Sequence, residues 1–265
     1  MKRKFIKKAK GTAFFVFLLG SLMLYAEDIR IDLHKGILKK ANTLGGFIIG
    51  KVEGPCDLIA KGGPIRIDTV MGELNAATSA GEIDINEIMA NARIKTGGGN
   101  IHVRTARGRL YAETYMGEIV IDSAKYVVAK TISGGDIKIY DLQEYADITT
   151  LGNILVVMPK AIKNSVICDI KSMEGDITLY IPKDFGANLE VRIPFSQDPT
   201  RENRIKSDFS FSELKQRHEE NGKYLSISTT FNRGGGKIKV FLSKGNLYIK
   251  ALTSDMQINP IRRTT

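Results

Sequence analysis

Several residue types are scarce in this chain of 265 residues, and each scarcity narrows the range of functions. The sequence contains no tryptophan, two cysteines and three histidines. The lack of tryptophan weakens a carbohydrate-binding interpretation, because indole rings are the best stacking surfaces. The histidines, His34, His102 and His218, have no serine or cysteine placed to complete a catalytic triad. No amphipathic segment of about ten residues or more separates the apolar stretches, which disfavours a doubly wound α/β fold.

Glycine, by contrast, recurs with a fixed period. It stands at every eighteenth position at Gly45, Gly63, Gly81, Gly99, Gly117 and Gly135, and later copies follow at Gly152 and Gly175. Most of these glycines are followed by a variable residue, an apolar residue, a variable residue and another apolar residue. A period of this kind is typical of repeat architectures. We expect the glycines to mark turns, because glycine adopts positive φ without strain.

The alternation after each glycine predicts a strand. Residues two apart lie on one face of a strand, so Ile119 and Ile121 should point inward and Val120 outward. A weaker copy of the phrase lies nine residues further on in each unit. The sequence therefore predicts an all-β fold, a single-stranded parallel β-solenoid resembling a β-helix or β-roll. Each coil should have about 18 residues and two strands, and at Tyr126 the second strand is shifted by one residue, which a bulge would absorb.

The chain divides into four segments. Residues 1–26, a basic head followed by an apolar run ending at Ala26, resemble a cleaved secretory signal peptide, with a retained anchor as the alternative. Residues 27–44 should form an N-terminal strand or cap. Residues 45–252 should form the solenoid domain, with a surface excursion at 194–222, and residues 253–265 a disordered tail. The protein should therefore be exported across the inner membrane, to the periplasm or the cell surface.

The net charge gives no reason to expect nucleic acid as a partner. The formal charge is +10, but six of the positive residues lie within the first ten positions, so about +4 remains after signal cleavage. Charges of both signs are interspersed over the rest of the chain, as on an ordinary protein surface. After cleavage we expect no membrane span.

These features resemble a known bacterial family. The signal-like segment, the repeated glycine phrases, the Ile205–Phe209 segment and the closing phrases at Gly234 and Gly245 are similar to those of the bacterial adhesin-like domain family. That family is related to the head GIN domain of auto-transporter adhesins. The resemblance covers roughly residues 45–250 and implies an exported β-solenoid of unknown function with no established enzyme activity. It identifies no binding partner.

Calcium binding and polysaccharide cleavage are two kinds of chemistry known for β-rolls and β-helices. A row of polar residues follows the glycines, and its stacked carboxylates could hold calcium or simply keep the rod soluble: Glu82, Asn100, Glu118, Asp136, Asn153 and Asp176. The turns lack the repeated aspartate of the calcium-binding β-roll, which favours the second interpretation. A β-helix lyase or hydrolase would need a groove of clustered acids and bases, and the sequence contains no such cluster. We expect no catalytic residues, no metal site and no cofactor.

The cysteines should not form a disulfide. Cys56 lies in the first coil and Cys168 in the seventh, so about six steps of 4.8 Å separate them. Bridged Cα atoms lie within about 7 Å of each other. We therefore predict two free thiols.

Outward aromatic residues are the remaining candidates for binding. Tyr111, Tyr115, Tyr140 and Tyr145 could stack on sugars or anchor a protein, or could be ordinary strand residues. The sequence thus predicts a non-catalytic, adhesin-like rod, a rigid binding or structural module of the cell envelope with an unknown protein or glycan partner. The alternative is a regulatory or sensor subunit of an envelope-stress system that binds a membrane protein. The sequence leaves the oligomeric state open.

Overall fold

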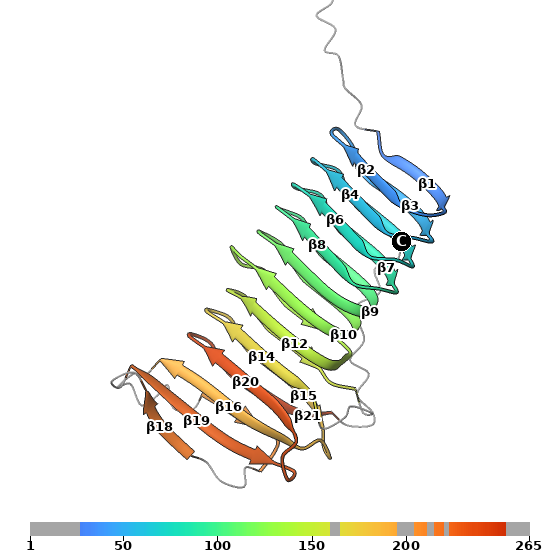
Figure 1. Ribbon diagram of the computed structural model, residues 1–265. Coiled ribbons are helices and arrows are strands. Elements are labelled where there is room, and N and C mark those ends of the chain that lie inside the picture. The colour runs from blue at the N-terminus through green and yellow to red at the C-terminus, as the bar shows by residue number, and fades with distance from the viewer. Residues whose placement is uncertain (1–26, 160–164, 195–203, 211–214, 220–222, 253–265) are drawn as a thin grey trace, which may run out of the picture.

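The chain folds into a straight rod of stacked β-strands. The computed structural model describes residues 27–159, 165–194, 204–210, 215–219 and 223–252. Successive strands step along the rod axis from β1 and β2 at one end to β18 and β19 at the other (Figure 1). The predicted all-β parallel solenoid, with two strands per coil and about 18 residues between paired positions, is confirmed. The predicted signal peptide and C-terminal tail lie outside the described residues.

The coils build two facing sheets, which β9 and β10 join because each runs through both. The first sheet contains, in spatial order, β1 (Ile29–His34), β3 (Phe47–Val52), β5 (Ile65–Val70), β7 (Ile83–Ile88), the first halves of β9 (Ile101–Thr114) and β10 (Ile119–Thr131), β11 (Ile137–Ile139), β13 (Ile154–Val157), β15 (Ile177–Pro182), β21 (Leu247–Leu252) and β17 (Ile205–Ser207). The second contains β2 (Leu38–Asn42), β4 (Cys56–Ala60), β6 (Leu74–Thr78), β8 (Ala92–Thr96), the second halves of β9 and β10, β12 (Leu142–Thr150), β14 (Ile167–Ser172), β20 (Gly236–Leu242), β16 (Ala187–Pro194), β19 (Tyr224–Phe231) and β18 (Lys215–Glu219).

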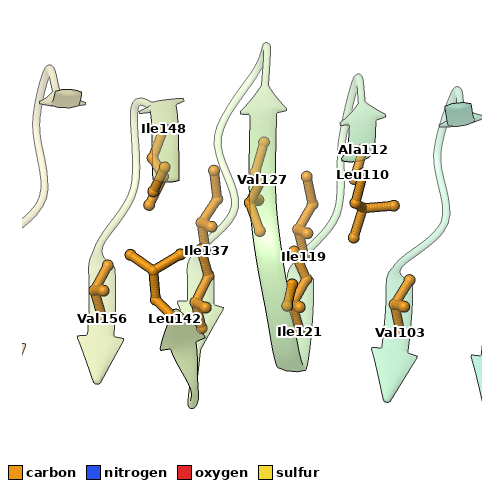
Figure 2. Packing of buried hydrophobic residues seen from close by; sticks show 14 of the residues in the cluster. Val103, Leu110, Ala112, Ile119, Ile121, Val127, Ile137, Leu142, Ile148 and Val156 are labelled. Carbon is orange, nitrogen blue, oxygen red and sulfur yellow. The ribbon is translucent and has the colours of Figure 1, made fainter. Parts of the chain in front are cut away.

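The core is a set of apolar columns between the two sheets. Ile83, Ile101, Ile119 and Ile137 stack in register in neighbouring strands, and each is fully buried. Figure 2 shows Ile119 and Ile121 of the first sheet pointing toward Val127 and Leu110 of the second. Stacking removes from water the apolar face that a single coil would leave exposed, and this burial is the main favourable contribution to folding.

The predicted irregularity near Tyr126 is confirmed. Ala124 pairs with Ala106, but Tyr126 pairs with Arg109, so β10 is one residue shorter than β9 at this corner. The same shift separates β10 from β12. The inward column resumes at Val127, which is fully buried.

The explanation expected for the repeated glycines is only partly correct. Gly117 and Gly135 have positive φ, but Gly63, Gly81 and Gly99 do not. What these turns require is space. A Cβ atom on Gly99 would lie 2.1 Å from the carbonyl oxygen of Gly81, and one on Gly81 would lie 2.1 Å from that of Gly63. The backbones of successive turns touch, and no side chain fits between them.

A buried hydroxyl ladder fastens these turns. Thr78, Thr96 and Thr114 occupy the last inward position of successive second-sheet strands and are almost fully buried. Thr96 Oγ1 donates a 2.8 Å hydrogen bond to the Gly81 carbonyl oxygen and accepts one of 3.2 Å from the Gly99 N–H. One hydroxyl thus connects the glycines of two neighbouring coils. Thr150 and Ser172 continue this pattern.

The chain order changes at the C-terminal end of the rod. β20 lies between β14 and β16, and β21 lies between β15 and β17, so this coil occupies an interior position. β19 pairs antiparallel with β16, and β18 pairs antiparallel with β19. β17 and β18 fall within the segment expected to be a surface excursion, and they add strands that the sequence did not predict.

The N-terminal coil has polar side chains in three inward columns. His34 follows the Val52 column, Lys40 the Leu58 column and Asn42 the Ala60 column. Asn42 Nδ2 donates 3.0 Å hydrogen bonds to the carbonyl oxygens of Glu27 and Gly46. A lysine at an inward position makes the strand edge unfavourable for pairing with another chain.

Candidate functional site

The three histidines lie on separate parts of the rod. His102, on the outer face of the first sheet, has Nε2 at 3.1 Å from Asp122 Oδ1 and Nδ1 at 3.6 Å from Asp84 Oδ1. Both ring nitrogens thus face carboxylates, and neither faces a hydroxyl or thiol. His34 Nε2 lies 3.0 Å from the Ile37 carbonyl oxygen at the entry coil, and His218 lies in β18.

The polar row after the glycines is a second ladder. Asp136 Oδ1 accepts a 2.9 Å hydrogen bond from the Asn153 N–H, Asn153 Oδ1 accepts one from the Asp176 N–H, and Asp176 Oδ1 accepts one from the Asn246 N–H. Glu118 forms an ion pair with Lys138. The side-chain oxygens of Asp136, Asn153 and Asp176 thus accept hydrogen bonds from backbone N–H groups of the next coil. Among the described residues, no three histidine, cysteine or carboxylate side chains gather as a metal-binding group.

The cysteines are free and buried, as predicted. Six strand-to-strand steps, through β6, β8, β9, β10 and β12, separate β4 from β14. Burial raises the pKa of each thiol to about 12, and Asp57 adds to the effect at Cys56. Both side chains therefore act as small apolar groups.

The four candidate tyrosines do not come together. Tyr111 and Tyr145 lie on the outer face of the second sheet, Tyr115 lies on a corner, and Tyr140 lies on the first-sheet side next to Asp122 of β10. Tyr111 lines a hollow on its face of the rod. We call this hollow the Tyr111 groove and define it by its charged, polar and aromatic lining residues, Glu73, Asn75, Asn91, Arg93, Arg109 and Tyr111.

The Tyr111 groove crosses four coils and has a volume of about 350 Å³. The Arg93 guanidinium lies 4.7 Å from the centre of the Tyr111 ring, and Lys95 Nζ lies 5.3 Å from it. Both cations come from β8, so they approach from one side, and Val128 of β10 borders the other. The Tyr111 hydroxyl donates to Glu113, and this hydrogen bond is the main reason that the tyrosine pKa is raised and the glutamate pKa is lowered.

Tyr126 continues this pattern in the next coil, and the sequence did not single it out for binding. Its hydroxyl donates to Glu144, and the Arg109 guanidinium lies 5.8 Å from its ring centre. Tyr126 pairs directly with Tyr145 of β12. The register shifts by one residue just before Tyr126, so the repeat pattern alone does not show that this side chain points outward.

A larger hollow, of about 510 Å³, lies near the C-terminal end of the second sheet. Its lining includes Lys215, Lys237 and Lys239, but no aromatic side chain. Lys239 is engaged with Glu190, at 3.6 Å. This hollow therefore offers cationic groups without the flat surface that the Tyr111 groove provides.

The described residues contain no helix of sufficient length and hydrophobicity to span a membrane. Comparison with protein-family models, curated proteins and solved structures finds no match to this chain. The adhesin-like resemblance stays a prediction, and function has to be inferred from the surfaces of the rod.

Proposed function

We propose that this protein is an exported, non-catalytic, adhesin-like rod that acts as a rigid binding module in the bacterial cell envelope. The observation that carries the proposal is the Tyr111 groove, where an aromatic ring, two arginines and two asparagines gather on one sheet face. One carboxylate, Glu73, also lines the groove, and among the described residues no three histidine, cysteine or carboxylate side chains gather there as a metal-binding group. These side chains can bind a ligand by stacking, ion pairing and hydrogen bonding, and this supports recognition as the role of the groove.

The ligand class that fits best is an acidic glycan. A tyrosine ring offers a flat apolar surface for a sugar ring, and asparagine side chains both donate to and accept from hydroxyl groups. Arg93 and Arg109 present planar guanidinium groups, which bind carboxylates in a bidentate manner. An extended polymer also suits a groove that continues across several coils.

The ladder architecture prepares this surface in advance. Each lining strand is hydrogen-bonded on both sides, and the inward neighbours Leu74, Ala92 and Leu110 are buried. The side chains of the groove are thus held on a stiff backbone, so that binding does not need to order a loop. Such preorganisation reduces the entropic cost of association.

The test is a titration of purified protein with polygalacturonate and hyaluronan, using neutral dextran as the control polymer. Tyr111→Ala and Arg93→Ala should each weaken binding to the acidic polymers by about tenfold, equivalent to about 1.4 kcal/mol. Tyr140→Ala, away from the groove, is the matched control and should leave affinity unchanged. Equal losses for Tyr111→Ala and Tyr140→Ala, or no binding to either acidic polymer, would contradict the proposal.

A further inference from the structure

A row of apolar residues, most of them exposed, runs along one long edge of the rod. It consists of Tyr115, Ile132, Leu151 and Met173, each the first residue after the inward hydroxyl at the end of a second-sheet strand, together with Met116. Tyr115 is 51% exposed, Ile132 41% and Met173 39%, whereas Leu151 is half-buried. We call this set the corner ridge. It lies on the turns that follow β9, β10, β12 and β14, which stack on one side of the rod (Figure 1).

Backbone hydrogen bonds fix the register of the corner ridge. The Ile132 N–H donates 3.1 Å to the Thr114 carbonyl oxygen, which places Ile132 beside Tyr115. The Met173 N–H donates 3.1 Å to the Thr150 carbonyl oxygen, which places Met173 beside Leu151. Lys130 pairs with Thr149, so Ile132 and Leu151 are also neighbours. Four apolar side chains therefore line up over about 14 Å, with Gly97 before them and Ser243 after them.

The two flanks of the corner ridge carry different charges. On the second-sheet flank the outward residues are, level by level, Glu113, Lys130, Thr149 and Lys171. On the first-sheet flank they are Glu118, Asp136, Asn153 and Asp176. One flank thus has two lysines and the other has three carboxylates. Glu113 and Glu118 already have partners, in Lys95 and Lys138, and Lys171 lies 3.1 Å from Asp169 of its own chain.

We infer that the corner ridge binds the corner ridge of a second copy of this chain, with the two rods side by side and parallel. A two-fold axis along the rods places each ridge residue opposite its own copy. It also turns the lysine flank of one rod toward the carboxylate flank of the other. Lys130 then faces Asp136 of the second copy, and Lys171 faces its Asp176, while Thr149 faces Asn153.

The antiparallel alternative has poorer charge complementarity. A two-fold axis perpendicular to the rods would bring like flanks together, so that Glu118 of one copy would face Asp176 of the other. That arrangement gains only a Glu113–Lys171 contact on the opposite flank. In the parallel arrangement the one unfavourable level, Glu113 against Glu118, involves carboxylates that lysines of their own chain already neutralise. Charge complementarity of this kind selects orientation more than it adds affinity.

The expected dimer is weak and depends on concentration. A ridge of five side chains per copy covers far less than the roughly 800 Å² per partner that stable complexes bury. End-to-end pairing is disfavoured in comparison, because Lys40 stands in an inward column at the N-terminal edge. Because Lys40 opposes pairing at the N-terminal edge, we expect the rods to associate side by side.

Sedimentation velocity over a concentration series tests the association, using protein purified from cells that express the full chain. The wild-type sedimentation coefficient should rise with concentration, and Ile132→Asp should raise the dimer dissociation constant at least about tenfold. Ile59→Asp is the matched control, since Ile59 is 54% exposed on the outer face of β4, away from the ridge. A wild-type protein that stays monomeric at every concentration, or equal effects of the two substitutions, would overturn the proposal.

Single cysteines test the orientation. In the parallel dimer, Tyr115→Cys and Met173→Cys should each form a disulfide with its own copy under mild oxidation. In an antiparallel dimer, neither would cross-link alone and only a mixture of the two variants would, which would refute the arrangement. The native thiols are buried and should not compete. If vesicles of anionic phospholipid bind the wild-type chain but not Ile132→Asp, and no self-association occurs, the ridge is a lipid-binding surface and the dimer is refuted.

Discussion

Thr114 Oγ1 donates a 3.0 Å hydrogen bond to the carbonyl oxygen of Gly99, and the threonine is fully buried. The same contact recurs one coil earlier between Thr96 and Gly81. A buried carbonyl that loses its only side-chain donor has no water to replace it, so each rung of this ladder stabilises the turn on which it acts.

Thr114→Val should therefore destabilise the protein by about 1–3 kcal/mol, because valine keeps the shape of threonine but removes the donor. The measurement is the free energy of unfolding from urea denaturation. Thr149→Val, on the outer face of β12, is the matched control and should change stability by less than about 0.5 kcal/mol. Indistinguishable values for the two variants would show that the hydroxyl ladder contributes little.

Gly99→Ala and Gly98→Ala provide a second matched pair within one turn. A Cβ on Gly99 would lie 2.1 Å from the Gly81 carbonyl oxygen, whereas the nearest atom to a Cβ on Gly98 is 3.8 Å away. We expect Gly99→Ala to lower the thermal unfolding midpoint strongly, because two coils must move apart. Gly98→Ala should leave the midpoint unchanged or raise it slightly, because alanine restricts the unfolded chain. A large loss for Gly98→Ala would contradict the stacking explanation.

Ile119→Asp and Val120→Asp test the alternation of faces. Ile119 is fully buried in the middle of an isoleucine column, while Val120 is half-buried on the outer face. The inward aspartate would place an unpaired charge in the core, so the first variant should unfold or aggregate. The second should keep the far-ultraviolet circular dichroism spectrum of the wild type. If both variants fold equally well, the assigned register is wrong.

Alkylation should distinguish the buried thiols from reactive ones. Burial raises the pKa of Cys56 and Cys168 to about 12, so the thiolate that reacts with iodoacetamide is almost absent in the folded protein at pH 8. We expect no labelling of the native chain and two labels per chain in urea, measured by mass spectrometry. Modification of either cysteine in the native protein would contradict this prediction.

The same shifts affect stability in alkali. The thiols have a higher pKa in the folded protein than the ordinary value of 9.0, so the folded state retains protons that the unfolded state releases. Their contribution is therefore constant below pH 9 and decreases as the pH rises toward 12. The double variant Cys56→Ala, Cys168→Ala should lose less stability than the wild type over that interval.

The sequence predicts the middle of the rod well because the determining interactions are local and repeated. The alternation around Ile101 and Ile119 states which side chains point inward, and the fixed period states which strands pair. Even the short corner at Tyr126 is visible as a break in that period. The threonine ladder could also have been predicted from the sequence, since Thr78, Thr96 and Thr114 recur at 18 residues. It was not predicted, because only apolar residues were expected at inward positions.

The strand order at the C-terminal end and the surface features depend on interactions between residues far apart in the sequence, which no local pattern encodes. The position of β20 between β14 and β16 follows from pairing across 70 residues. The Tyr111 groove depends on side chains from four neighbouring coils. The outward row at Asp136 looks the same in sequence whether it binds cations or backbone N–H groups. The structure assigns the second role, at 2.9 Å from the Asn153 N–H.

The interior position of β20 and β21 has a consequence for how the rod can vary in length. Coils such as those beginning at Gly81 and Gly99 have equivalent shapes, so whole units could be gained or lost there without disturbing either end. The C-terminal coil is different, because β16 is synthesised before the strand that separates it from β14. During synthesis the upstream coils can form one after another, but the position between β14 and β16 can be filled only after β20 has been made. The number of coils in the middle of the rod can thus vary, whereas the C-terminal end requires β20 to insert between two strands made earlier.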